Sequence, residues 1–238
     1  MPIGAAVHGR SACEHVSNGL LTFTLPRPRL ISNEQILSTM RACVLEHGPA
    51  VSLDKVAAKL HVSGPALLKR FGSREELMLH ALRPPAEPPL LGQYATGPDS
   101  RPLEAQLVSH FSATWDFFAE IIPCIAALRE SGIAHTKIFD AKRVGPLRLV
   151  KALTCWLEQA MTKGLVDSPA LESAATAMLG AIQTRVFTAY MLKQPYSATS
   201  QREYLDDIAR LFARALAPPR RKRTGNEWRL PRTKGTAP

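Results

Sequence analysis

The sequence has few of the features that mark disulfide-bonded, metal-binding or membrane proteins. Its four cysteines, at positions 13, 43, 124 and 155, form no C-x-x-C pair and no Cys/His pattern with ligand spacing. Cysteines scattered in this way are usually small buried hydrophobic residues, so neither a metal site nor a disulfide framework is expected. No apolar run approaches the roughly 18 residues that span a bilayer, and the N-terminus lacks a basic region followed by an apolar core. We therefore expect a cytoplasmic protein with no cofactor and no membrane contact.

Motifs of catalysis are missing as well. The sequence contains no glycine-rich phosphate loop, no H-E-x-x-H motif and no carboxylate pair at helical spacing in an apolar context. Strand-like alternation of apolar and polar residues is absent from the second half of the chain. These absences argue against an enzyme, and an all-α small-molecule enzyme stays only as a less favoured alternative.

Positive charge, in contrast, is abundant and unevenly distributed. The net charge of +10 divides into +1 over residues 1–28, +3 over 29–83, zero over 84–217 and +6 over 218–238. The excess therefore lies toward the two ends of the chain, and the long centre is neutral. This asymmetry favours a polyanion as the partner of the ends and a different task for the centre.

Helical periodicity and breaker residues predict an all-α fold in five segments. A proline-rich stretch such as "RPPAEPP" cannot be helical because proline lacks an N–H group and clashes with the preceding turn. The expected segments are a flexible extension (1–28), a domain of short helices (29–83), a Pro/Gly-rich linker (84–102), a larger helical domain (103–217) and a disordered basic tail (218–238).

Serine caps mark the helices of the first domain. Ser32 or Asn33, Ser52 and Ser63 are expected to begin its first three helices, and Ser73 with Glu76 forms a capping box for the fourth. In the larger domain, helices are expected over 103–122, from about Pro123 to 131, and over 146–163, 169–193 and 201–216, with a looser stretch at 132–145.

The second and third helices, joined by the short "LHV" connection, fit a helix-turn-helix. The third helix has small residues only in its first turn, where "SGPA" at 63–66 permits close approach to base edges. Leu67 and Phe71 point inward, while Lys69 and Arg70 are expected outside, within reach of phosphates. Arg74 begins the fourth helix, where the positive helix end favours an anion.

The stretch "SLDKVAAKLHVSGPALLKRFGSREELMLHAL" resembles the DNA-binding domain of the tetracycline-repressor (TetR) family of bacterial transcription regulators, over roughly Glu34 to Leu82. Among its departures, His61 stands where glycine is usual, which makes the turn less permissive or gives His61 a left-handed conformation. Asp54 occupies a position where some members read bases with a basic residue, and base reading is not carried over to it.

The resemblance implies an N-terminal helix-turn-helix domain and a larger C-terminal helical domain that binds a ligand and dimerises. It also implies a sequence-specific, effector-responsive regulator, most often a repressor, that binds double-stranded DNA at a palindromic operator as a homodimer associated with the nucleoid. The basic ends keep a non-specific DNA-organising protein open as an alternative.

The expected DNA contacts combine the helix-turn-helix with a short arm before it. Arginines of "LPRPRL" at 25–30 are placed to enter the minor groove, although the same stretch also fits a stiff proline linker. The Arg220–Arg223 cluster is either a solvated tail or a source of further phosphate contacts. The residues expected to contact DNA are Ser52, Ser63, Gly64, Pro65, Ala66, Leu68, Lys69, Arg70, Arg74, Arg27 and Arg29.

Two further sites are expected in the larger domain, and for both the alternative is ordinary packing in the core. In the family, the last two helices form a four-helix bundle with their symmetry mates. This implies a dimer interface at Ala177, Gly180, Ala181, Tyr204, Ile208, Leu211 and Phe212. A pocket for an apolar or aromatic effector would be lined by His110, Thr114, Trp115, Phe118, Cys155 and Met161.

Overall fold

The computed structural model describes residues 31–139 and 145–219, and every regular element within these ranges is a helix. The all-α expectation is confirmed for this part of the chain. Arg27, Arg29 and the Arg220–Arg223 cluster lie outside the described residues, so their expected contacts with DNA stay predictions.

The first four helices pack around one apolar core and form the smaller part of the molecule, which we call the head (residues 31–83). The predicted caps at Ser32, Ser52 and Ser73 are confirmed, because each hydroxyl accepts a hydrogen bond from a backbone N–H of the first turn. Ser63 holds the predicted cap position without such a side-chain bond. The helices are α1 (Asn33–His47), α2 (Leu53–Lys59), α3 (Gly64–Phe71) and α4 (Arg74–Leu82).

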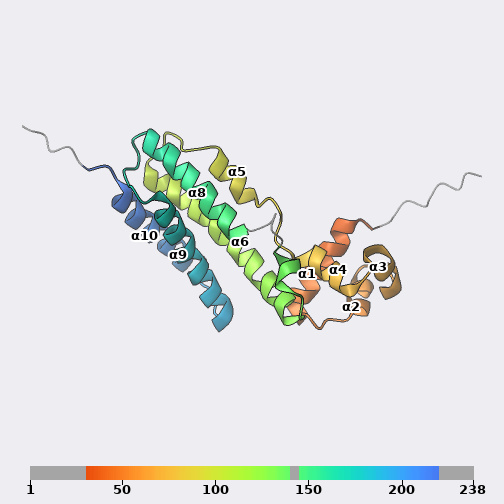
Figure 1. Ribbon diagram of the computed structural model, residues 1–238. Helices are drawn as coiled ribbons and strands as arrows, with labels where there is room; N and C mark the ends of the chain where they lie inside the picture. Colours follow the sequence, from red (N-terminus) through yellow and green to blue (C-terminus); the bar gives the residue numbers. More distant parts are fainter. Residues whose placement is uncertain (1–30, 140–144, 220–238) are drawn as a thin grey trace, which may run out of the picture.

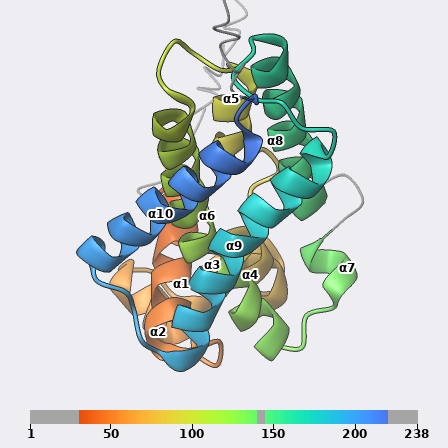
Figure 2. The same cartoon turned by 90° about the vertical axis from the view of Figure 1, so that its left-hand side faces the viewer.

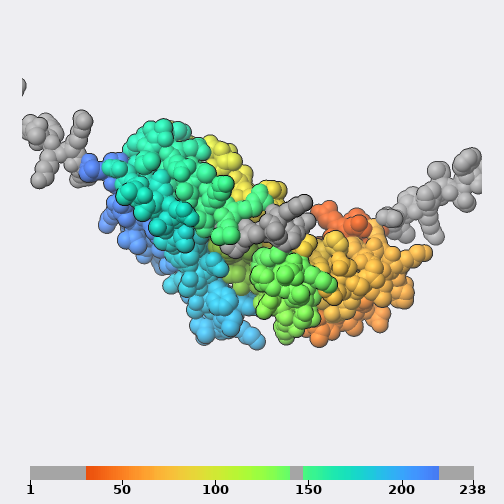
Figure 3. All heavy atoms as spheres, in the orientation of Figure 1, coloured from red at the N-terminus to blue at the C-terminus, as the bar shows by residue number. Residues whose placement is uncertain are grey.

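Six more helices form the larger part, which we call the body (residues 89–139 and 145–219) and which lies beside the head in Figure 1. In the view turned by 90°, α9 and α10 lie on the face of the body toward the viewer (Figure 2). The end of α9 projects from the lower edge of the body in the space-filling view (Figure 3). The helices are α5 (Pro89–Ala95), α6 (Leu103–Glu130), α7 (His135–Ile138), α8 (Gly145–Thr162), α9 (Leu171–Leu192) and α10 (Ala198–Leu216).

Two expectations about helix boundaries are wrong. The predicted linker over 84–102 contains α5, whose Leu90 and Tyr94 are buried in the core of the body. The predicted break at Pro123 is absent, because α6 continues through it. Buried neighbours on both sides of Pro123, Phe118 and Cys124, hold the helix together across the missing N–H group.

The helix α6 belongs to two hydrophobic cores. Its first half, with Leu107, Phe111 and Phe118, lies in the core of the body, and its last turns, with Cys124 and Leu128, lie in the core of the head. It is the one helix of the described residues long and apolar enough, by length and composition alone, to cross a membrane. Its buried apolar side chains are divided between the two cores, so α6 connects the head with the body.

Candidate nucleic-acid interface and effector pockets

The turn between α2 and α3 is closed by a helix-capping motif. The N–H group of Val62 donates to the Ala57 carbonyl at 3.0 Å, and the N–H group of His61 donates to the Ala58 carbonyl at 3.2 Å. This pair of bonds ends a helix at a left-handed residue. His61 is that residue, with φ of 54°, so its expected left-handed conformation is confirmed. The motif fixes where α3 begins relative to α2.

The outer face of α3 combines small and apolar residues with one lysine. Pro65, Ala66 and Leu68 are exposed, and Leu67 on the opposite side is buried in the head. Lys69 is exposed and, within the described residues, neither a hydrogen bond nor an ion pair holds its ammonium group. Ser63 is exposed at the start of the helix. These residues form the surface that the sequence predicted for DNA.

Gly64 does not belong to that surface, contrary to the prediction. It is buried, and a Cβ atom at this position would lie 2.6 Å from the Asp54 carboxylate oxygen of α2. The glycine therefore serves the close approach of α3 to α2 and offers no face to a base.

Arg70 and Arg74, both expected to contact phosphates, are bound to backbone carbonyl groups. Arg70 donates to the Ile31 carbonyl at 2.7 Å and so ties α3 to the segment before α1. Arg74 donates to the Val51 carbonyl at 3.0 Å and to the Pro49 carbonyl, both in the connection between α1 and α2. Carbonyl groups in a connecting segment lack partners from regular structure, and these guanidinium groups supply them. Both arginines therefore hold the head together.

Lys55 is not among the predicted DNA contacts, although it lies on the outer face of α2 within one turn of Ser52. Both residues are exposed, and the Ser52 hydroxyl accepts from the Lys55 N–H group at 3.3 Å. Lys59, one turn later, is paired with Glu46 at 3.0 Å. Side-chain exposure at the start of α2 was the signal, because helix starts next to the recognition helix approach the DNA backbone.

An apolar cavity of about 320 Å³ lies between α6, α8, α9 and residues 84–88, which we call the strap. Its wall includes three strap prolines and Phe118, and among the described residues that line it none is charged. We call this cavity the strap pocket. Its further lining residues are Phe117, Ile121, Ile122, Ile125, Ala126, Phe139, Leu149, Gln183, Phe187, Tyr190 and Met191.

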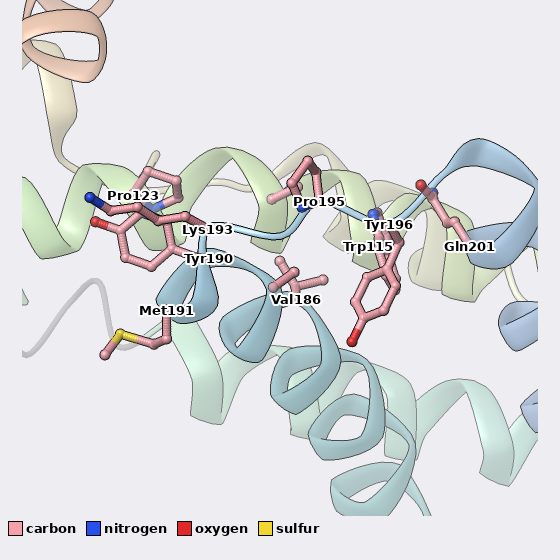
Figure 4. Close-up of a pocket in the computed structure, with 11 residues that line it drawn as sticks. Trp115, Pro123, Val186, Tyr190, Met191, Lys193, Pro195, Tyr196 and Gln201 are labelled. Carbon is pink, nitrogen blue, oxygen red and sulfur yellow. The ribbon is translucent and has the colours of Figure 1, made fainter.

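A second, more open cavity of about 600 Å³ separates α6 from the end of α9 and its connection to α10. Trp115 and Tyr196 lie together at one end of it, with ring centroids 6.0 Å apart, and Pro123 and Lys193 lie at the other end (Figure 4). Because Pro123 lacks an N–H group, the carbonyl of Ala119, which also lines the cavity, loses its usual helical donor. We call this cavity the α9 crevice.

The predicted effector residues fall in four different places. Trp115 lines the α9 crevice and Phe118 lines the strap pocket. Cys155 and Met161 are exposed on α8, contrary to the prediction, because the buried stripe of that helix runs through Leu153 and its neighbours on the opposite side.

His110 and Thr114 of α6 are buried in the core of the body. The Thr114 hydroxyl donates to the His110 carbonyl at 2.7 Å and lies 3.0 Å from the Tyr94 hydroxyl. The His110 ring packs edge-on against Trp156, with centroids 4.6 Å apart. Desolvation, aided by the charge of Arg101, lowers the pKa of His110 to about 4, so the ring is neutral at neutral pH. These residues form core contacts and line neither cavity.

Two models of one protein family match the sequence. The model described as bacterial regulatory proteins of the tetR family matches residues 36–81, and the C-terminal domain described as AefR-like transcriptional repressor matches residues 134–218. Together they cover more than half of the chain. The chain belongs to the TetR family of bacterial transcriptional regulators.

Solved structures of TetR-family regulators share the fold. A regulator from Mesorhizobium loti is 14% identical over 78% of this chain and 96% of its own, with a TM-score of 0.63. A transcriptional regulator from Rhodococcus sp. Rha1 is 16% identical over 79% and 100%, with a TM-score of 0.60. The TetR-family regulator PfmR from Thermus thermophilus is 19% identical over 76% and 97%, with a TM-score of 0.57. A search of curated proteins found no match.

As a TetR-family protein, the chain is a DNA-binding transcriptional regulator, and its class is that of regulators rather than enzymes. Its predicted dimer residues are divided by the structure. Ile208 is buried in the core of its own chain, and half-buried Phe212 packs against Phe111 there. Tyr204 is half-buried and donates to the Ala181 carbonyl at 3.0 Å.

The exposed apolar surface of this TetR-family chain lies mainly on the outer side of α9. Ala177 and half-buried Gly180 follow that side, and Phe187 and Met191 continue it with side chains 49% and 59% exposed. Leu211 on α10 is 62% exposed. Phe187 and Met191, which the predicted interface did not include, also line the strap pocket.

Proposed function

We propose that this TetR-family protein is an effector-responsive repressor that binds a palindromic operator as a homodimer at the nucleoid of a bacterial cytoplasm. The exposed first turn of α3 carries this proposal, because it presents small residues and is followed by a lysine that no described residue binds. Internal arginines hold this helix-turn-helix in place. A recognition helix held in this way can place its side chains in the major groove, and small side chains let it approach base edges.

The proposed contacts divide into those that read bases and those that bind phosphates. Pro65 and Ala66 are suited to apolar contact with a thymine methyl group. Lys69 and Lys55, with the hydroxyl of Ser52, are suited to phosphate oxygens. Arg70 and Arg74 are left out of this set because their guanidinium groups are engaged with carbonyls.

The proposed effector is an uncharged apolar or aromatic molecule bound in the strap pocket. An uncompensated charge in a cavity without charged walls would have a large desolvation cost, so the described lining disfavours ionic ligands. The volume of about 320 Å³ is typical of small-molecule sites. Ligand binding that favours a different arrangement of the two heads would weaken operator binding.

Genome-wide recovery of sheared DNA from the same organism, with the purified protein at near-physiological salt, tests the DNA-binding part. We expect a few enriched palindromic sites. Uniform recovery of all DNA would instead favour a non-specific DNA-organising protein, and recovery of none would contradict DNA binding of either kind.

Two lysine variants sharpen that experiment. Lys69→Ala is expected to weaken binding to every recovered site and to reduce the salt slope by about two, one phosphate contact in each protomer. Lys151→Ala removes another exposed lysine, on α8, and is expected to change neither quantity. Equal effects of the two variants would contradict the proposed contact surface.

A further inference from the structure

The strap, residues 84–88, separates two cavities of opposite character. Pro84 and Pro85 line the apolar strap pocket and also a polar cavity of about 790 Å³ on the other side. The polar cavity lies between head and body, and Arg41, Glu76 and Glu120 are among its walls. A strap pushed away from the strap pocket therefore has open space to enter, at the junction between the two parts of the molecule.

The strap is suited to transmit such a push toward the head. Three of its five residues are prolines, whose fixed φ makes proline-rich segments semi-rigid spacers. It follows α4 directly, and Arg83, at the end of α4, donates to the Ile138 carbonyl at 3.3 Å and to the Lys137 carbonyl. A displacement of the strap thus acts directly on α4, the last helix of the head.

Arg148 of α8 holds the strap at its middle. Its guanidinium donates to the Ala86 carbonyl at 2.7 Å and to both carboxylate oxygens of Glu87 at 2.8 and 3.0 Å. The next residue, Leu149, is 1% exposed and lines the strap pocket. One turn of α8 therefore contacts the pocket with one side chain and the strap with its neighbour.

Stability alone does not explain this contact. The Glu87 side chain is 73% exposed, and exposed ion pairs contribute only about 0–1 kcal/mol. The geometry is more specific than that of an ordinary surface pair, because one guanidinium nitrogen donates to a main-chain carbonyl while another contacts both oxygens of the Glu87 carboxylate. Its position, between the pocket wall and the path to the head, indicates a role in communication.

We propose that Arg148 is the positioning residue that couples the strap pocket to the head. It holds the strap against α8 while the pocket is empty. An apolar molecule in the pocket displaces Leu149 or the prolines, which separates Arg148 from Ala86 and Glu87 and moves α4. This inference rests on the proposed effector response, and it assigns that response to one contact.

The uncharged dye N-phenyl-1-naphthylamine, whose fluorescence rises in apolar sites, is the probe for the test. Its binding to the full-length protein is titrated, and its effect is read in two ways: operator affinity and hydrogen–deuterium exchange of the α4 amides. In the wild type we expect the dye to weaken operator binding at least about fivefold, the lower end of common allosteric couplings, and to accelerate α4 exchange. Ile122→Trp, which fills the strap pocket, should weaken dye binding and so locate it.

Arg148→Ala is expected to bind the dye with an affinity within about twofold of that of the wild type. In this variant the dye should weaken operator binding by less than about twofold and should accelerate α4 exchange little. Arg148→Lys, which keeps the charge without the planar fork, should retain part of the coupling and guards against a folding defect in the alanine variant. Arg210→Ala is the matched control, because the acidic side chains that Arg210 pairs with are remote from the strap.

Each outcome decides the matter. Wild-type coupling in Arg148→Ala would overturn the inference and leave the proposed effector response standing. Dye binding without any change at α4 in the wild type would overturn both the inference and the strap pocket as the controlling site. Absence of dye binding would do the same. Failure to recover an operator would refute the proposed DNA function, whereas the exchange measurement would still judge the role of Arg148.

Discussion

Several arginines of the described chain donate to backbone carbonyl groups of distant segments. Arg41 contacts the Ala81 carbonyl at 2.7 Å, and Arg70, Arg74 and Arg148 make comparable contacts with Ile31, Val51 and Ala86. Carbonyl groups at helix ends and in connections need donors, and a guanidinium carries five N–H groups on a long stem. A basic residue near the DNA surface is therefore not by itself a phosphate ligand.

Arg74→Ala is expected to lower the free energy of unfolding by about 2 kcal/mol, because two carbonyl groups lose a charged donor. Urea unfolding measures this change. Lys69→Ala should alter stability by less than about 0.5 kcal/mol and should weaken operator binding instead. If Arg74→Ala kept full stability and lost DNA binding, the originally predicted phosphate contact would be right.

His110 gives the body a dependence on pH. Its folded pKa of about 4 lies below the value of about 6.5 expected for the unfolded chain. Between these values the unfolded chain binds the extra proton, so the free energy of unfolding rises with pH through this window. Stability from this group is complete above about pH 6.5 and is lost as the pH falls toward 4, by about 3 kcal/mol at most.

Urea unfolding at a series of pH values tests that assignment with His110→Phe, which keeps a ring against Trp156 and cannot titrate. We expect the wild-type stability to fall between pH 6.5 and 4 and the variant to show a shallower dependence. Parallel curves would mean that His110 is not the group responsible.

At the scale of helices, capping residues nearby in the sequence determine where a helix begins, whereas packing against distant segments determines whether it continues. The serine caps Ser32, Ser52 and Ser73 act within three residues and could be found from the sequence. The continuity of α6 through Pro123 could not, because it depends on two cores built from segments far apart in the chain. The same holds for Arg148, whose partner Ala86 is 62 residues away.

The proline within α6 leads to a prediction about stability. Pro123→Ala restores the N–H group that the Ala119 carbonyl lacks, and an interior proline costs a helix about 3 kcal/mol relative to alanine. We expect the free energy of unfolding to rise by about 1–3 kcal/mol, measured by urea unfolding. Pro89→Ala, at the first position of α5 where proline is well tolerated, is the control and should give no gain. A loss of stability in Pro123→Ala would show that the surrounding packing depends on the proline.

At the scale of the whole molecule, the division into head and body is less sharp than the sequence predicted. The head's core includes Cys124, Leu128, Ile133 and Ile138, all from beyond the predicted boundary at residue 83. Composition and breaker residues locate the proline-rich strap correctly as non-helical, but they carry no information on which core a later helix completes. The sequence therefore predicted the class of fold and the place of the DNA surface better than the connection between the two parts.

The exposed apolar residues of α9 and α10 are a further feature at the scale of the whole molecule. Large exposed side chains such as Leu211, 62% exposed, commonly mark protein interfaces. In a two-fold dimer, Leu211→Glu would bury two unpaired charges, so we expect the dimer dissociation constant to rise by about 100-fold, equivalent to about 3 kcal/mol. Sedimentation equilibrium measures this, and operator affinity should fall with it because a monomer carries one recognition helix.

Leu147→Glu provides the matched control, since Leu147 on α8 is 69% exposed and does not belong to the predicted interface. It should leave both the dimer and operator binding unchanged. Dissociation in both variants would point to a general effect of added charge, because the two leucines differ in place and not in exposure. Dissociation in neither would exclude Leu211 from the interface and restrict the contact to the outer side of α9.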